Sequence, residues 1–321
     1  MTTTHAWVVG ARGLLGAAVT ARMVGAADWT VVETDPLPWS EPNAVVFDDA
    51  VRACTESLLA AAAGSPWAVV WCAGVAVTGS TAVQLERERD QLQRVLDILA
   101  AATARQPGPP GSFFYASSAG GVYAGADAPP FTENTPPRPL APYGHAKLRS
   151  EAMVVGFGAA TGTKVLVGRI ANLYGPGQSI GKSQGLITQL AKANYSPQPA
   201  SIYVPLETVR DYIYADDCAG LVVDALERLV HGDDASVTKI FASHQAVTIA
   251  ALLGHFTALH KARPHVMLGM SPTAGYQAVD LRLRSVVWTD LDRRDQMPLP
   301  VGIQVTAQAI IAAMQAGSLA R

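Results

Sequence analysis

Hydrophobic runs alternate with amphipathic stretches along most of the chain. Short runs rich in Val, Ile, Phe and Trp are typical of buried strands, whereas apolar positions spaced three and four residues apart indicate helices. Strands that alternate with helices form a parallel sheet covered on both faces. The pattern predicts strands at 5–9, 29–33, 44–47, 67–72, 112–116, 164–169 and 238–242, and helices at 17–24, 82–104, 143–158 and 186–193.

The first predicted strand is followed at once by a glycine-rich turn, Gly10-Ala11-Arg12-Gly13-Leu14-Leu15-Gly16. Gly10 permits a tight turn, Gly13 lets a pyrophosphate approach the backbone, and Gly16 allows the following helix to pack closely on the strand. Unpaired N–H groups at the start of that helix attract anions. Because the strand at 29–33 is followed by Asp35, we expect a dinucleotide site in which an acid binds ribose hydroxyls.

A tyrosine and a lysine stand four residues apart where the helix at 143–158 begins. In Ala141-Pro142-Tyr143-Gly144-His145-Ala146-Lys147 the phenol and the ammonium share one helix face. A free tyrosine has a pKa of about 10, and a neighbouring cation that favours the phenolate brings such a group toward its working range at neutral pH. The pair is a candidate device for proton transfer.

Composition narrows the class of protein. The chain has 321 residues, of which 49% are hydrophobic, and a formal charge of -2, which suits a large core and argues against nucleic-acid binding. Cys54, Cys72 and Cys218 have no metal-ligand spacing, so we expect reduced core cysteines and no metal. Gly64-Ser65-Pro66 interrupts the apolar run 58–77, so no membrane span is expected. We expect a cytoplasmic enzyme.

Five motifs follow one another in a set order: Gly10-x-x-Gly13-x-x-Gly16, the segments 113–118 and 142–147, Arg169-Ile170-Ala171-Asn172-Leu173-Tyr174-Gly175-Pro176-Gly177, and the segment 209–217. In this order they resemble the extended short-chain dehydrogenase/reductase family, or NAD-dependent epimerase/dehydratase family of nucleotide-sugar enzymes. The resemblance implies an α/β fold, a Rossmann doubly wound parallel sheet with a smaller C-terminal substrate-binding α/β subdomain. The dinucleotide-binding domain would comprise 1–173 and 212–243, and the substrate-binding domain 174–211 and 244–321.

The resemblance also implies three catalytic residues. Tyr143 would be the acid or base on a sugar hydroxyl or ketone, Lys147 would bind the nicotinamide ribose and favour the phenolate, and Ser118 would hydrogen-bond the reacting oxygen. Counting forward from the strand at 113–115 gives Ser118, whereas counting back from Tyr123 gives Ala119, so this chain carries one extra residue before Val122-Tyr123. The strand should fix the register better than the turn, which favours Ser118, with Ser117 as the alternative. The next residues, 119–121, are Ala-Gly-Gly. They lack the acids of 4,6-dehydratases and decarboxylases and the cysteine of fucose-synthase-type epimerases, which leaves hydride chemistry at C4 of the sugar.

Two interpretations at C4 differ in their cofactor. A 4-epimerase retains NAD, whereas a 4-ketoreductase consumes NADPH. Arg12 resembles an arginine that pairs with the 2′-phosphate of NADP in relatives, while Asp35, or Glu33, would repel that phosphate, so the cofactor is NAD or NADP. Asp48, after the predicted strand at 44–47, stands where relatives have an acid near the adenine amine. The implied cofactor-binding residues are Gly10, Arg12, Gly13, Leu14, Leu15, Gly16, Asp35, Asp48, Ala73, Gly74, Tyr143 and Lys147.

Asn172 and Arg210 match family positions that hold the sugar nucleotide, and the fixed fork of donors in arginine suits a phosphate. Between them, the segment 175–208, which contains Gly177, Gly181 and Gly185, leaves the sheet and could cap the sugar. One departure is the turn 88–91, Glu-Arg-Asp-Gln, where relatives carry an Asn-rich turn facing the cofactor.

These features favour an NAD(P)-dependent 4-epimerase of nucleotide-diphosphate sugars. The alternatives are an NADPH-dependent 4-keto-sugar reductase and a reductase of a non-nucleotide carbonyl. A non-catalytic cofactor-binding regulator would have lost Tyr143 or Lys147, and both are present. Because the helices at 82–104 and 143–158 often pair across a dimer in the family, we also expect a homodimer.

Overall fold

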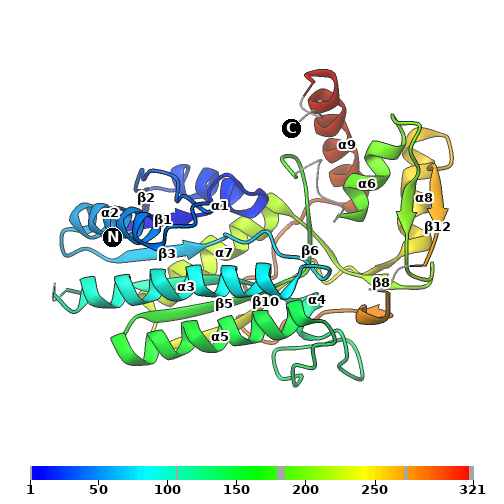
Figure 1. Cartoon of the computed structure of the whole chain (residues 1–321). Coiled ribbons are helices and arrows are strands. Elements are labelled where there is room, and N and C mark those ends of the chain that lie inside the picture. Colours follow the sequence, from blue (N-terminus) through cyan, green and yellow to red (C-terminus); the bar gives the residue numbers. More distant parts are fainter. Residues whose placement is uncertain (1, 106–107, 179–184, 271–273, 318–321) are drawn as a thin grey trace.

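The computed structural model describes residues 2–105, 108–178, 185–270 and 274–317. Its largest element is a sheet of six parallel strands in the order β10-β5-β4-β3-β1-β2 (Figure 1). Each strand begins and ends within two residues of a predicted one, so the predictions for these six strands are confirmed. They are β1 (Thr4–Val9), β2 (Trp29–Val31), β3 (Trp67–Trp71), β4 (Ser112–Ser118), β5 (Lys164–Ile170) and β10 (Ser236–Phe241).

Helices cover both faces of this sheet. Along β1, Ala6 and Val8 belong to the core formed with helices α1 (Leu14–Val24) and α7 (Ala215–His231). Trp7 and Val9 point to the opposite face, because side chains alternate along a strand, and belong to a second core. The helices of that second core are α2 (Ala44–Ala62), α3 (Ala82–Thr103) and α5 (Pro142–Thr161). The doubly wound α/β sheet is therefore confirmed.

The strand predicted at 44–47 is wrong, because α2 begins there. The side chain of Asn43 accepts a hydrogen bond from Val45 N (3.0 Å) and caps the helix. Val45 and Val46 are 62% and 45% exposed, whereas Phe47 is buried. The three apolar residues thus do not form one buried run. Burial instead recurs at helical spacing, at Phe47, Val51, Cys54, Leu58 and Ala62.

Small sheets and further helices lie at the end of the main sheet where α4 (Ala119–Val122) and the start of α5 are found (Figure 1). The small sheets pair β6 (Asn172–Tyr174) with β9 (Tyr212–Tyr214), β7 (Ala200–Ile202) with β12 (Val266–Leu268), and β8 (Val209–Arg210) with both β11 (Val247–Thr248) and β13 (Asp280–Leu281). The helices are α6 (Leu186–Ala193), as predicted, α8 (Ile249–His260), the short η1 (Ala274–Tyr276) and α9 (Leu299–Gln315). Gly181 lies outside the described residues. A third core, which includes Tyr174, Leu190, Leu252, Phe256 and Ile303, holds this part together.

The C-terminal segment 280–293 returns to the main sheet. Lys239 of β10 is fully buried, and its Nζ donates hydrogen bonds to Ser285 Oγ (2.9 Å), Val287 O (2.8 Å) and Asp292 Oδ2 (2.9 Å). Glu133, from the loop before α5, accepts hydrogen bonds from Ile240 N (2.8 Å) and Ser285 Oγ (2.6 Å). A buried charge without partners is strongly destabilising, so the last strand of the main sheet and the C-terminal segment stabilise each other.

None of the helices in the described part of the chain is both long and apolar enough to cross a membrane. Within the same residues, no three His, Cys, Asp or Glu side chains gather as a metal site would require. The three cysteines are free, with Cys54 and Cys218 buried and Cys72 half-buried.

Candidate active site

The glycine turn after β1 forms a cradle that side chains would fill. Gly10 has φ +87°, and a Cβ there would lie 2.8 Å from Ala73 N, at the end of β3. A Cβ on Gly16 would lie 2.2 Å from Gly10 O. Gly13 is the N-cap of α1, so the N–H groups of Leu14 and Leu15 fall in the first turn, where a helix has no internal acceptors. Tight backbone packing and unpaired donors fit the pyrophosphate of a dinucleotide.

The loop between β3 and α3 borders this cradle and is held by an acid from the helix. Gly74 has φ +145°, a conformation that favours glycine. Oε1 of Glu88 accepts hydrogen bonds from the next two amides, Val75 N (2.5 Å) and Ala76 N (2.6 Å). The departure that the sequence showed at 88–91 therefore makes contact with the loop that lines the dinucleotide cradle.

Tyr143 and Lys147 lie on one face of α5, as predicted. Pro142 occupies the first turn, where its fixed φ suits a helix start. Lys147 Nζ lies 5.7 Å from the centroid of the Tyr143 ring and 5.2 Å from that of Tyr115. It donates hydrogen bonds to Ala116 O (3.3 Å) and to Tyr115 OH (3.4 Å). Burial opposes the positive charge, but Tyr115, Tyr143 and Glu88 together outweigh it and raise the pKa of Lys147. The ammonium therefore stays charged between two phenol rings.

Tyr115 is a residue that the sequence interpretation did not single out. Its side chain is buried on β4, and burial is the main cause of its raised pKa. The sequence nevertheless contained evidence for it. Tyr115 is the one residue of the motif 113–118 with an ionisable ring, and it lies two positions before Ser117, so both side chains are on the same face of the strand.

The two candidate serines have different surroundings. Ser117 is buried and its Oγ donates a hydrogen bond to Glu151 Oε1 (2.5 Å). Ser118 is half-buried and caps α4, since its Oγ accepts a hydrogen bond from Gly121 N (3.1 Å). A Cβ on Gly121 would lie 3.0 Å from Tyr143 Cε1 and 3.4 Å from Ser118 Oγ. The ring of Tyr143 and the hydroxyl of Ser118 thus flank Gly121, whereas the Ser117 hydroxyl is engaged elsewhere.

A buried ion pair lies next to the candidate catalytic residues. Arg169 of β5 binds Glu151 of α5, with Nη2 2.7 Å from Oε2, and both side chains are 9% exposed. Nη1 of Arg169 also donates to Tyr123 OH (2.7 Å), which in turn donates to Thr132 O (3.0 Å). Glu151 lies one turn beyond Lys147 on the same helix, so the network ties α5 to β4 and β5 next to the candidate catalytic residues.

Asn172 and Arg210 lie where the small sheets leave the main sheet. The Asn172 Nδ2 donates a hydrogen bond to Asp211 O (2.8 Å). The Arg210 side chain is largely buried, and its Nη1 donates to Ala278 O (2.8 Å) and Val209 O (2.9 Å). Burial is the main cause of the lowered pKa of Arg210. The structure thus holds both residues at the junction of the two parts of the molecule.

The residues expected around the adenosine differ in their exposure and in their side-chain partners. The side chains of Arg12 and Asp35 are exposed, and within the described residues neither forms a side-chain hydrogen bond or ion pair. Asp48 was placed near the adenine because it followed an expected strand. It lies instead in α2, where Oδ2 pairs with Arg94 Nη1 of α3 at 2.9 Å, so that assignment loses its basis.

A family model decides the classification. The NAD dependent epimerase/dehydratase family matches residues 6–240 of the chain. The protein belongs to this family. Family membership agrees with the glycine cradle, with the Tyr143 and Lys147 pair and with the six-stranded parallel sheet.

Individual relatives are similar over less of the chain. A dTDP-4-dehydro-6-deoxyglucose reductase from Escherichia coli is 31% identical over 139 residues, which are 43% of this chain and 42% of the relative. The chain spans less than half the length of the curated relatives it matches.

Two solved structures share the fold over nearly the whole chain. One is the UDP-glucuronic acid 4-epimerase from Bacillus cereus in complex with UDP-glucuronic acid and NAD, with a TM-score of 0.77, 19% identity and coverage of 96% of this chain and 99% of that one. The other is RMD from Pseudomonas aeruginosa complexed with NADPH, with a TM-score of 0.75, 20% identity and coverage of 95% and 99%. At these identities the likeness shows the fold alone.

Proposed function

We propose that the protein is an NAD(P)-dependent enzyme that acts at C4 of a nucleotide-diphosphate sugar, as a 4-epimerase. The observation that carries the proposal is the placement of the Tyr143 ring and the Ser118 hydroxyl on either side of Gly121, with the Lys147 ammonium against the same ring. This arrangement supplies a proton acceptor, a hydrogen-bond donor and a fixed cation around one small space. In line with family membership, the glycine cradle fits a dinucleotide beside it.

The residues divide the chemistry between them. A bound nicotinamide supplies the acceptor, and for an epimerase also the donor, of hydride at the sugar C4. As the hydride leaves C4, Tyr143 in its phenolate form takes the proton of the C4 hydroxyl, and a ketone results. Ser118 donates a hydrogen bond to that oxygen, and Lys147 stabilises the phenolate. In an epimerase, Tyr143 would then return the proton to the same oxygen once the nicotinamide had reduced C4 on its opposite face, which would give the 4-epimer. Atoms and electrons balance without a further reactant.

A 4-keto-sugar reductase is the second candidate, because it needs the same residues and only half of this cycle. The unpaired Arg12 in the glycine turn favours it, since a guanidinium there suits the 2′-phosphate of NADPH. The E. coli reductase noted above is among the relatives. The exposed Asp35 favours NAD instead. The nucleotide released by denaturing the purified protein separates the two: retained NAD supports an epimerase, and an empty protein with NADPH-dependent turnover supports a reductase.

The cofactor choice can be tested at Arg12 itself. If the 2′-phosphate binds there, Arg12→Ala should weaken NADPH relative to NADH by about 1.5–3 kcal/mol, the range for a hydrogen bond to a charged group. Arg22, a basic residue in the last turn of α1, is the control position. Equal losses of affinity for NADPH and NADH in Arg12→Ala would show that Arg12 does not bind the 2′-phosphate.

The substrate diphosphate is assigned to the junction of the two parts of the molecule. We place the dinucleotide-binding domain at 1–173 and 212–243 and the substrate-binding domain at 174–211 and 244–321. Most residues of the third core fall in the second of these, although Tyr212 and Tyr214 also belong to it. Asn172 and Arg210 lie at this boundary, where open parallel sheets bind ligands. Isothermal titration of UDP, dTDP and GDP into the cofactor-loaded protein tests the assignment. If none binds below millimolar concentration, a reductase of simpler carbonyls becomes the better description.

We also infer a homodimer formed through α3 and α5, which lie side by side on one face of the sheet. The outer face of α5 carries small or apolar exposed residues, including Ala152, Gly156 and Val155, the last 38% exposed. Val155→Arg should then shift the mass measured by light scattering toward that of the monomer. An unchanged mass in a folded Val155→Arg protein would exclude this interface.

A further inference from the structure

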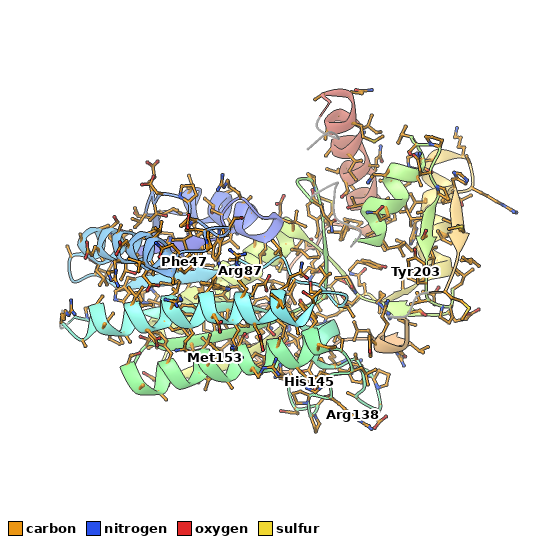
Figure 2. The ribbon with its side chains drawn as sticks, viewed as in Figure 1. Phe47, Arg87, Arg138, His145, Met153 and Tyr203 are labelled. Carbon is orange, nitrogen blue, oxygen red and sulfur yellow. The ribbon has the colours of Figure 1, made fainter. Side chains whose placement is uncertain are left out.

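The turn 87–91 of α3 holds two separate loops at the carboxyl edge of the sheet. Glu88 binds the amides of Val75 and Ala76 after β3. Arg87 Nη2 (2.6 Å) and Gln91 Nε2 (3.0 Å) both donate to Trp39 O, in the connection between β2 and α2. In Figure 2, Arg87 of α3 and Phe47 of α2 lie on the sides of these helices that face each other. The ring of Trp39 packs on Phe47 at a centroid distance of 5.8 Å. One turn of helix therefore fixes the loops that follow the strands on either side of β1.

The β3 loop borders the glycine cradle, and the β2 connection follows the strand on the other side of β1. The β3 loop begins at Ala73, whose backbone N would be 2.8 Å from a Cβ on Gly10, so the turn and the loop are in backbone contact. The β2 connection contains Asp35, the residue assigned to the ribose. A displacement of the β3 loop would therefore change the shape of the glycine cradle.

The Glu88 carboxylate is suited to hold the loop. It accepts two charge-assisted hydrogen bonds from successive amides, and such bonds are stronger than neutral ones. Its Oε2 would be 3.4 Å from a Cβ on Gly74, so it also packs on the residue with φ +145°. Glu88 is half-buried and its charge acts on Lys147. The same carboxylate thus contacts the loop and lies near the catalytic cation.

We propose that Glu88 is a positioning residue, which holds the segment 74–76 in the conformation that binds the dinucleotide cofactor. The proposal rests on the proposed cofactor site and adds to it a residue that does not itself need to touch the cofactor. An alternative is that the carboxylate occupies, as an internal anion, amides that would otherwise bind a phosphate of the cofactor. The two roles make opposite predictions for cofactor affinity when the carboxylate is removed.

Three substitutions separate the functions of the side chain. Glu88→Ala removes both hydrogen bonds and the charge. Glu88→Asp keeps the charge but is one methylene too short to reach both amides. Glu88→Gln keeps an oxygen acceptor at the same distance and removes the charge. Glu86→Ala, at an exposed position of the same helix, is the matched control, and near-ultraviolet circular dichroism reports whether each variant is folded.

The first readout is hydrogen exchange of the amides of Val75 and Ala76 in the protein without added cofactor. We expect exchange at least about 10-fold faster in Glu88→Ala and Glu88→Asp, a smaller increase in Glu88→Gln, whose neutral oxygen still accepts, and a change under about 3-fold in Glu86→Ala. Unchanged exchange in folded Glu88→Ala and Glu88→Asp would overturn the proposal, whether or not the protein binds a dinucleotide. If Glu88→Ala does not fold, the Glu88→Asp result decides.

The second readout is the Kd of NADH and of NADPH, measured from fluorescence of the bound nicotinamide. For whichever dinucleotide the parent protein binds, the Kd should rise at least about 10-fold in Glu88→Ala and Glu88→Asp, and by a smaller factor in Glu88→Gln. Tighter binding in Glu88→Ala would overturn the positioning role in favour of an internal anion. A parent protein that binds neither dinucleotide refutes the proposed function, and the exchange experiment still tests the contact of Glu88 with its loop.

Discussion

The proposed cofactor part, built on the main sheet, and the proposed substrate part, built on the small sheets, differ in how their sites are formed. In the cofactor part, the glycine turn and the β3 loop each follow directly from a strand of one continuous sheet, and Tyr143 and Lys147 lie in the first two turns of one helix, α5. In the substrate part, the sheets have strands of two or three residues, and apolar side chains such as Met267, Leu268 and Met270 are 52–99% exposed. A site formed by one local connection is specified by a short motif. A site formed where several distant segments meet depends on how those segments pack.

The strongest test of the cofactor part is Tyr143→Phe. It removes the ionisable oxygen and leaves a ring that still packs against Gly121, so the fold and cofactor binding should be unchanged. Turnover should fall at least about 100-fold, the loss expected for a missing general acid or base. Steady-state kinetics with a nucleotide sugar measures kcat, and circular dichroism checks the fold. Near-normal turnover would refute the proposed chemistry.

The corresponding test of the substrate part is Arg210→Ala. A contact with a remote phosphate is mostly uniform binding, so KM for a nucleotide sugar should rise about 10- to 100-fold while kcat changes less. Because Arg210 also donates to Ala278 O, the thermal midpoint of the variant should be measured in parallel. Arg282, an exposed arginine paired with Asp280, is the control position. A fall confined to kcat would show that Arg210 does not bind the diphosphate.

A smaller effect is expected for Tyr115→Phe. It deletes one of two hydrogen-bond acceptors of Lys147 and leaves Ala116 O. We expect kcat to fall about 5- to 10-fold, equivalent to about 1–1.4 kcal/mol, with little change in the KM of the sugar nucleotide. Tyr195→Phe, on an exposed ring, should have no effect. An unchanged kcat in Tyr115→Phe would show that Ala116 O alone suffices to place the ammonium.

The smallest effect concerns the junction between the parts. Burial opposes the charge of His244, but Asp292, 3.7 Å away, outweighs it and raises the pKa of His244. A raised pKa in the folded state stabilises the protein below the unfolded pKa of about 6.5, and this stability is lost as pH rises through the higher folded value. This contribution to the free energy of unfolding should therefore decrease as the pH rises from 6 to 9. His244→Asn, which suits the positive φ of this position, should remove this component of the slope. Urea titrations at several pH values provide the measurement, and an unchanged slope would contradict it.

Prediction from sequence succeeded where the signal was local. The turn from Gly10 to Gly16 and the pair of Tyr143 and Lys147 were placed correctly on their elements, because each lies within one turn of a strand or helix boundary. The segment 44–47 failed, since three apolar residues in a row suit a strand as well as a helix, and the Asn43 cap decides for the helix. Asp48 was misplaced as a consequence.

Other features needed the tertiary structure. The choice between Ser117 and Ser118 as the catalytic serine depends on Glu151, which binds the Ser117 hydroxyl and lies 34 residues from it along the chain. The carboxylate of Glu88 reaches amides 12 and 13 residues earlier, and no spacing rule predicts that contact. In the substrate part, the partners of Arg210 come from residues 277–278, beyond the region where family motifs occur.

The buried Lys239 limits how the protein can be divided. Its ammonium takes all three of its acceptors from residues 285–292, although Lys239 itself belongs to the cofactor part. A fragment that stops at residue 243 would contain every motif of the family but would lack all three of these acceptors, so we expect it to be less stable than the whole chain. The proposed boundary therefore separates two functions and does not separate two segments that could fold independently. Chimeras that exchange substrate parts between relatives would have to carry the C-terminal segment and its lysine together.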